Sequence, residues 1–197
     1  MQEEHRDPFE RYMYPRLTGT AARQLAQTSR RFENVPKGPV TREDIDYLIR
    51  EGSVDILLAS GVNPMKAMMI AIELGAVDVV RQLLPRLKYQ SKNRAARQAI
   101  VMNNPIVLST IRNDYRIVDV DRRVGIILGD LDTAMSNWKP GKTETIRYLL
   151  SMLPLNVDVR GPYTHARGKY NNEDLLDAYN EYFDAQSDWY RQARGNK

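Results

Sequence analysis

The chain has 197 residues, of which 42% are hydrophobic and 27% charged, as is usual for a globular protein with a sizeable core. It has no cysteine, which excludes disulfides, thiolate metal sites and cysteine nucleophiles. No apolar run approaches the roughly 18 residues of a membrane-spanning helix, and the charged N-terminus does not resemble a secretory signal. The lack of cysteine fits a reducing compartment, and we expect an intracellular protein of the cytoplasm or nucleus, without a membrane segment. The net charge is +4.

Residues 1–38 form the first region, which ends in a Pro/Gly stretch that predicts a turn or linker. The segment from Phe9 to Phe32 resembles an F-box, because Leu25, Ser29 and Arg30 match its pattern of spaced apolar residues followed by Ser and Arg. The resemblance implies docking onto a Skp-type adaptor of cullin ubiquitin ligases. The alternative is a helical pair that caps the next region. The adaptor contact implied by the resemblance consists of Pro15, Leu17, Leu25 and Phe32.

Residues 41–153 form the second region and are helical by pattern. Thr41 followed by Asp44 is typical of a helix N-cap. Apolar residues then recur at helical spacing in successive stripes, and Pro85 predicts a helix end. One stripe continues through Ile106, Val107 and Ile111. Strand-like alternation is scarce and is best at residues 117–120, so we predict an all-α fold.

Two stretches of this region, residues 75–87 and 141–153, fit one template, G-x-x-[DE]-x-[VI]-R-x-L-L-x-x-L. Weaker copies lie at 48–57 and 99–108, and Gly75 and Gly141 are 66 residues apart, which is two periods of 33. Gly or Asn tolerates the left-handed conformation that ends a helix. An acid three residues later stabilises the start of the next helix. The pattern predicts stacked helical pairs that form a recognition surface.

The stretch 71–84 resembles the second half of an ankyrin repeat, and the resemblance extends over about residues 43–153. The family's Thr-Pro-Leu-His tetrapeptide is replaced by Lys66-Ala67-Met68-Met69, so we expect divergent repeats with irregular loops. We also expect an insertion at residues 130–140. The resemblance implies protein binding through turns and a concave helical face. Combined with the F-box-like segment, it resembles proteins of large DNA viruses. The alternative is a plain helical bundle.

Positive charge is concentrated in residues 85–123, which have nine Lys or Arg and three acids. Such a stretch is either an ordinary solvated surface or a binding surface for an acidic partner, nucleic acid included. It contains only two aromatic residues, which disfavours stacking on single strands. The residues of the predicted basic, partner-binding surface are Lys88, Lys92, Arg94, Arg97, Arg112 and Arg116.

Residues 154–197 form the third region, for which we expect a loop around Arg160-Gly161-Pro162 and then one helix. Asn171 or Asn172 can cap that helix. Its broad aromatic face includes Tyr179, Trp189 and Tyr190. A helix of this kind either covers the last face of a repeat stack or docks into a partner's groove.

No catalytic or metal-binding pattern emerges. Gly141-Lys142-Thr143 lacks the earlier glycine and the preceding strand of a phosphate-binding loop, and neither His5 nor His165 has a ligand partner at helical spacing. We therefore expect no enzyme activity, metal or cofactor. The first hypothesis is a protein–protein interaction adaptor that recruits a target to a cullin-type ubiquitin ligase. The alternative is a non-enzymatic structural or assembly protein, associated with a virus particle if the source is viral, with a basic, nucleic-acid-facing surface.

Overall fold

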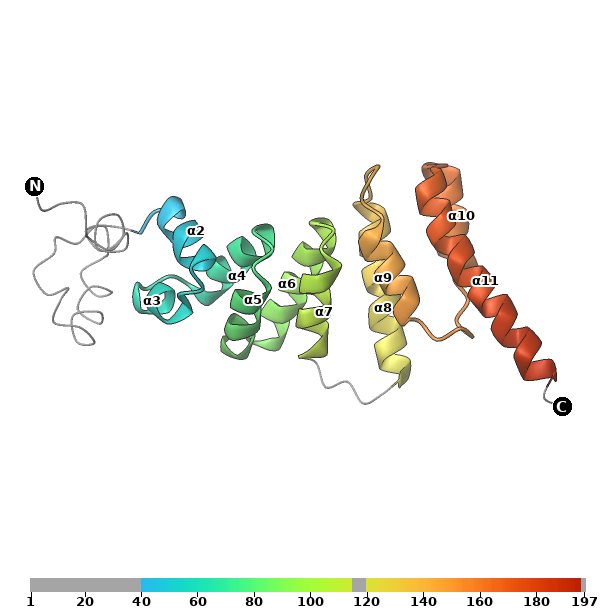
Figure 1. Ribbon diagram of the computed structural model, residues 1–197, viewed down its shortest axis with the longest axis horizontal. Helices are drawn as coiled ribbons and strands as arrows, with labels where there is room; N and C mark the ends of the chain where they lie inside the picture. Colours follow the sequence, from blue (N-terminus) through green and yellow to red (C-terminus); the bar gives the residue numbers. More distant parts are fainter. Residues whose placement is uncertain (1–39, 115–119, 196–197) are drawn as a thin grey trace, which may run out of the picture. The chain divides into compact units, whose positions relative to one another are not determined.

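The computed structural model describes residues 40–114 and 120–195, and every regular element in these ranges is a helix (Figure 1). The predicted all-α class is therefore confirmed for these residues. They divide into two compact units, one ending at Ala95 and the other beginning at Ala96, so that the boundary lies inside helix α6 (Tyr89–Val101). No helix of the described ranges is long and apolar enough to cross a membrane. The F-box-like segment 1–38 lies outside the described residues.

In the first unit, helices pack in pairs. Helix α2 (Arg42–Arg50) packs on α3 (Val54–Ala59) and on α4 (Pro64–Glu73), and α4 packs on α5 (Val77–Leu83). An ion pair between Arg42 and Glu73, with Nη2 and Oε2 2.7 Å apart, also joins α2 to the end of α4. The interior is aliphatic, and Met68 serves as a core side chain. The core of this unit includes Ile45, Leu48, Leu57, Met68, Ile72, Val80 and Leu83.

Two helix boundaries of this unit follow from local chemistry. The Thr41 hydroxyl accepts a bond from the backbone N–H of Asp44, and the Asp44 carboxylate accepts one from the N–H of Thr41. This capping box pairs two N–H groups that lack partners in a first turn. Helix α5 ends at Leu83, and the 3-10 turn η4 (Leu84–Arg86) follows with Pro85 inside it. Proline cannot donate the next helical hydrogen bond. Both predicted boundaries are confirmed.

Three of the four template turns share one backbone geometry. Gly52, Gly75 and Asn103 have positive φ angles of 68°, 66° and 54°. In each turn, the N–H of this residue donates to the carbonyl three residues earlier, and the next N–H donates to the carbonyl five residues before it. These two bonds define the Schellman motif. At Gly141 the turn differs, because Lys142 donates to Lys139 across Pro140 and Gly141, which suits proline and glycine at the centre of a tight turn.

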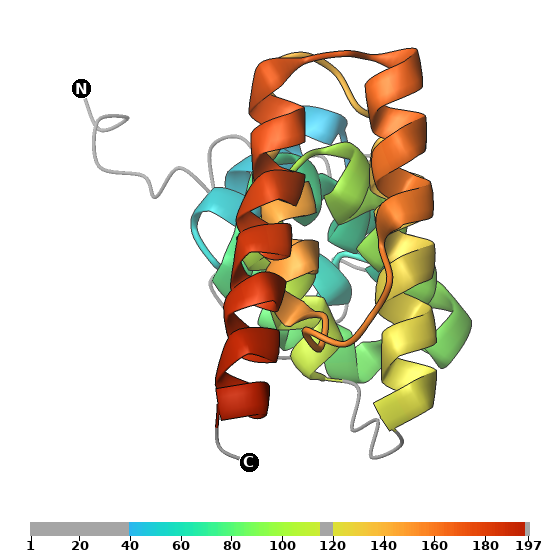
Figure 2. The same cartoon turned by 90° about the vertical axis from the view of Figure 1, so that its right-hand side faces the viewer.

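The second unit is built around helix α9 (Glu144–Met152), which packs on α7 (Pro105–Asn113), α8 (Val120–Ser136) and α11 (Glu173–Gly195). Helix α10 (Arg160–Lys169) packs on α8 and on α11. Figure 2 shows α10 and α11 side by side, joined by a short turn at one end. The core of this unit includes Val107, Leu108, Ile111, Leu131, Leu149, Leu150 and Tyr179.

The structure corrects two expectations for this unit. Val120, the last residue of the segment with the best strand-like alternation, begins helix α8, which continues to Ser136. Residues 160–162, expected as a loop, are the first residues of helix α10, so that Gly161 and Pro162 lie in its first turn. Proline is tolerated there because first-turn N–H groups have no helical acceptor. A Gly-Pro pair therefore did not indicate a loop at this position.

Candidate interaction surfaces

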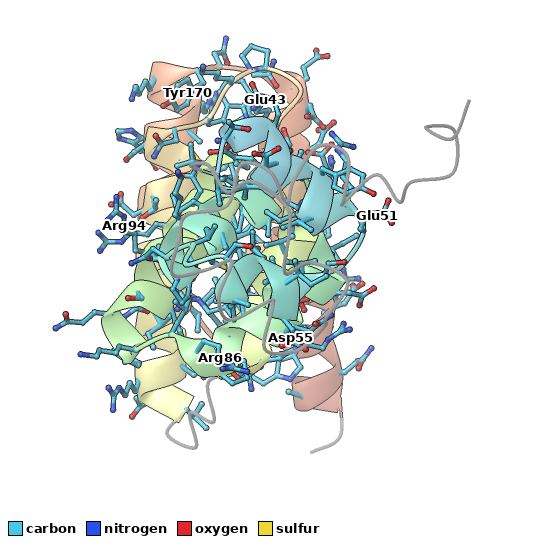
Figure 3. All side chains as sticks on the ribbon, turned by 90° about the vertical axis from the view of Figure 1, so that its left-hand side faces the viewer. Glu43, Glu51, Asp55, Arg86, Arg94 and Tyr170 are labelled. Atoms are coloured by element: carbon cyan, nitrogen blue, oxygen red, sulfur yellow. The ribbon has the colours of Figure 1, made fainter. Side chains whose placement is uncertain are left out.

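The predicted basic residues separate into exposed and buried members. In the first unit, Lys88 and Arg94 are exposed, and Arg94 projects away from the helices (Figure 3), whereas Lys92 is half-buried. In the second unit, Arg97 is exposed. Arg112 is largely buried in an ion pair, and Arg116 lies outside the described residues. Of the six predicted residues, the exposed ones in the described ranges are therefore Lys88, Arg94 and Arg97, each considered within its own unit.

Arg112 on α7 binds Asp130 on α8 through two parallel hydrogen bonds. Its Nε donates to Oδ2 at 2.8 Å and its Nη2 donates to Oδ1 at 2.5 Å. The two side chains keep only 11% and 8% of their exposure. Burial raises the pKa of Asp130 above its ordinary value, and the Arg112 guanidinium opposes part of that rise. Sequence reasoning missed this pair because the partners are 18 positions apart on different helices.

A groove runs beside this ion pair along helix α8. One face of α8 supplies Arg123, Ile126, Ile127 and Asp130, which recur at the spacing of neighbouring helical turns. The facing walls are the last turns of α7 and α9, and the volume of the groove is about 130 Å³. We call this the α8 groove. Its facing residues are Arg112, Asn113, Leu149 and Met152.

Asn103 joins the α6–α7 turn to the start of helix α9. Its side-chain Oδ1 accepts a hydrogen bond of 3.1 Å from the backbone N–H of Thr145. Its Nδ2 donates to the carboxylate of Glu144, and this bond lowers the pKa of Glu144 below its ordinary value. The other two Schellman turns have glycine at this position, which has no side chain. Asparagine here therefore provides both the left-handed backbone and a link to the next pair of helices.

The Asn103 turn is the third of the four template turns along the chain. It exposes three apolar side chains, Val101, Met102 and Ile106, which we call the third-turn patch. Their exposed fractions are 39%, 37% and 66%. Ile106 was predicted in a core stripe, and that prediction is wrong. Adjacent positions on a helix point about 100° apart, and it is Val107 that occupies the core.

The other turns carry charge at the equivalent positions. Three residues after the turn residue, where the third turn has Ile106, stand Asp55, Asp78 and Glu144. Two residues before it, in place of Val101, stand Arg50, Glu73 and Lys139. The third turn is therefore apolar at two positions where the chain otherwise places charge.

Helix α11 is anchored along its first half and exposed at its end. Asn172 caps it by accepting a bond from the N–H of Leu175, as predicted for this position. The Tyr182 hydroxyl donates to a carbonyl of the 153–159 loop, with Pro154 O at 2.7 Å. Beyond Gln186, every side chain from Ser187 to Gln192 is exposed, including those of Trp189 and Tyr190. The predicted aromatic face is thus buried only in its first half.

The residues of the rejected phosphate-loop pattern have structural contacts. The buried Thr143 hydroxyl donates to Asp174 Oδ2 at 2.5 Å, and Trp138 Nε1 donates to the same hydroxyl. Arg147 adds an ion pair to Asp174. These contacts connect the start of α9 to the start of α11. Among the described residues, no group of three or more His, Cys, Asp or Glu side chains is placed to hold a metal ion.

Comparisons of the chain with models of protein families, with curated proteins and with solved structures gave no match.

Proposed function

We propose that this protein is a non-enzymatic protein-binding module with divergent, ankyrin-like helical repeats, and that its third turn contacts the partner. The observation that carries the proposal is the third-turn patch. Val101 and Ile106 leave aliphatic surface in water at two positions where the other turns place charge. Exposed contiguous apolar surface rimmed by polar residues is typical of protein interaction sites.

Contacts inside each unit support the repeat arrangement. In the first unit, residues 49–52 and 75–79 line one shallow hollow, so the first and second turns are neighbours. In the second unit, Asn103 bonds directly to the start of α9. In stacked repeats each pair of helices contacts its neighbour, so that recognition side chains are displayed in a row.

Restoring charge to the third turn tests the proposal. We expect the double variant Val101→Glu, Ile106→Asp to lose most capture of the protein that the wild type co-purifies from its own cells. The melting temperature should be unchanged, because both side chains are exposed. The matched control is Arg50→Gln, Asp55→Asn at the equivalent positions of the first turn, and it should capture normally. Undiminished capture by the charged variant contradicts the proposal.

The proposal extends to a ligase role through the segment 1–38. By resemblance to an F-box, Pro15, Leu17, Leu25 and Phe32 would contact a Skp-type adaptor, and the repeats would hold the target inside the cell. The test is a pull-down with purified adaptor, in which wild type binds and Leu25→Asp and Phe32→Asp do not. If the wild type does not bind the adaptor, the ligase role is contradicted, and the proposed protein-binding function is unaffected.

The alternative is a structural or assembly protein with a nucleic-acid-facing surface, associated with a virus particle if the source is viral. Lys88, Arg94 and Arg97 favour it, because all three are exposed and form no ion pair with the described residues. Backbone binding by such cations weakens steeply with salt. Duplex DNA or RNA affinity that falls about tenfold or more between 50 and 200 mM salt supports this function, and salt-independent or absent binding removes it.

A further inference from the structure

The α8 groove combines an aliphatic floor with a guanidinium that has no partner among the described residues. Ile126, Leu149 and Met152 form apolar walls, and Arg123 lies one turn before Ile126 on α8. Arg123 is exposed and forms no ion pair or hydrogen bond with any described residue. An arginine beside apolar surface can hold a carboxylate while its neighbours hold an aliphatic group.

The charges around the groove favour an anionic ligand. At the far end, Asp130 is neutralised by Arg112, and Arg97 is close enough for its charge to act on Asp130 as well. Arg123 is seven positions from Asp130, about 10 Å along the helix axis at 1.5 Å per residue. The Arg123 end is therefore the open cationic end, and the middle of the groove is apolar.

The size of the groove limits what it can hold. Its volume is about 130 Å³, well below the roughly 300 Å³ at which pockets for drug-sized ligands begin. A cofactor or nucleotide does not fit, whereas a single aliphatic side chain does. The ligand must then present its carboxylate next to that side chain, because Arg123 and Ile126 are one helical turn apart.

We propose that the α8 groove binds an acidic segment of a partner protein, which inserts a leucine-like side chain against Ile126 and Met152 and pairs a neighbouring carboxylate with Arg123. The inference rests on the proposed protein-binding function and names the chemistry of the partner. It adds a second contact, separate from the third-turn patch in its residues and in its mode of recognition.

The test uses the full chain and three short probes: acetyl-Glu-Leu-amide, acetyl-Gln-Leu-amide and acetyl-Glu-Ala-amide. We expect the first to shift backbone NMR signals of α8 and of the last turn of α9 in a saturable way. The second lacks the charge and should bind about fivefold more weakly, as for an exposed ion pair. The third lacks the aliphatic anchor and should bind about tenfold more weakly or not at all.

A variant of the chain assigns the charge contact. Arg123→Gln should weaken acetyl-Glu-Leu-amide about fivefold and leave acetyl-Gln-Leu-amide unchanged. Arg86→Gln is the matched control, because Arg86 (labelled in Figure 3) is also exposed and forms no ion pair with any described residue. The melting temperature of each variant verifies that the chain still folds.

Three results each overturn the inference: no saturable shift in the wild type, equal affinity for the charged and neutral leucine probes, or unchanged affinity in Arg123→Gln. None of them affects the third-turn patch, whose test depends on Val101 and Ile106. Conversely, if the Val101→Glu, Ile106→Asp variant loses partner capture but the probes do not bind at α8, only the groove proposal is removed. The two proposals can therefore fail separately.

Discussion

Asn103 shows how one residue can serve backbone and packing together. Its φ of 54° lies in the left-handed region, which glycine adopts freely and asparagine tolerates better than most residues. The template allowed Gly or Asn at this position without distinguishing them. The structure distinguishes them, because the asparagine amide bonds to the backbone of Thr145 and to the carboxylate of Glu144.

We predict that Asn103→Gly destabilises the protein by about 1 kcal/mol. The variant keeps the turn but loses both bonds to α9, each worth about 1 kcal/mol, and part of this loss is offset because glycine suits the conformation. The comparison variant is Gly52→Ala, which has open space around the added methyl group and should lose about 1 kcal/mol through backbone strain alone. Urea unfolding measures both. If Asn103→Gly is as stable as the wild type, the hydrogen bonds from Asn103 to α9 do not stabilise the fold and the prediction is contradicted.

The ion pair between Arg112 and Asp130 is a second contact between helices that one substitution can remove. We predict that Arg112→Gln costs about 3 kcal/mol, because it leaves the buried Asp130 carboxylate without its counter-charge. Arg94→Gln, which alters an exposed arginine, should change the free energy of unfolding by less than about 0.5 kcal/mol. Chemical denaturation measures the free energy of unfolding of both variants. A loss below about 1 kcal/mol for Arg112→Gln contradicts a structural role for the ion pair.

At the scale of helices, local signals predicted boundaries well. The Thr41 capping box, the stop at Pro85 and the Asn172 cap each depend on residues within a few positions of one another, and all three are confirmed. Contacts between helices were not predictable, because Arg112 and Asp130 carry no sequence spacing that indicates a pair. The start of helix α10 was not predicted because the local signal is ambiguous. Gly161 and Pro162 are compatible with the first turn of a helix as well as with a loop.

The junction of α9 and α11 should respond to acid. The Thr143 hydroxyl bond, with help from Arg147, lowers the pKa of Asp174 below its ordinary value of 3.8. The ionised form is therefore favoured by folding, so this contribution is complete above that pH and is lost as the pH falls through the lowered value. Asp174→Asn should reduce the loss of stability between pH 5 and pH 2, measured by urea unfolding. An undiminished loss of stability in Asp174→Asn over this pH range contradicts the assignment.

At the scale of the whole molecule, the proposed role is to hold another protein. The third-turn patch stands out among turns that share one backbone geometry. The Gly52 and Gly75 turns carry charged residues at the two positions where the Asn103 turn carries Val101 and Ile106. The repeated template predicted these turns. Periodicity alone placed Ile106 in the core, since a stripe of apolar letters does not show which of two adjacent residues points inward.

Photo-crosslinking in cells that naturally contain the protein tests the central claim most directly. A benzophenone amino acid replaces Ile106 in one variant and Asp55 or Asp78, at the equivalent positions, in the others. We predict a discrete adduct with one protein from position 106 and none from 55 or 78. No adduct at 106, or the same adducts from all three positions, contradicts a partner-binding third turn.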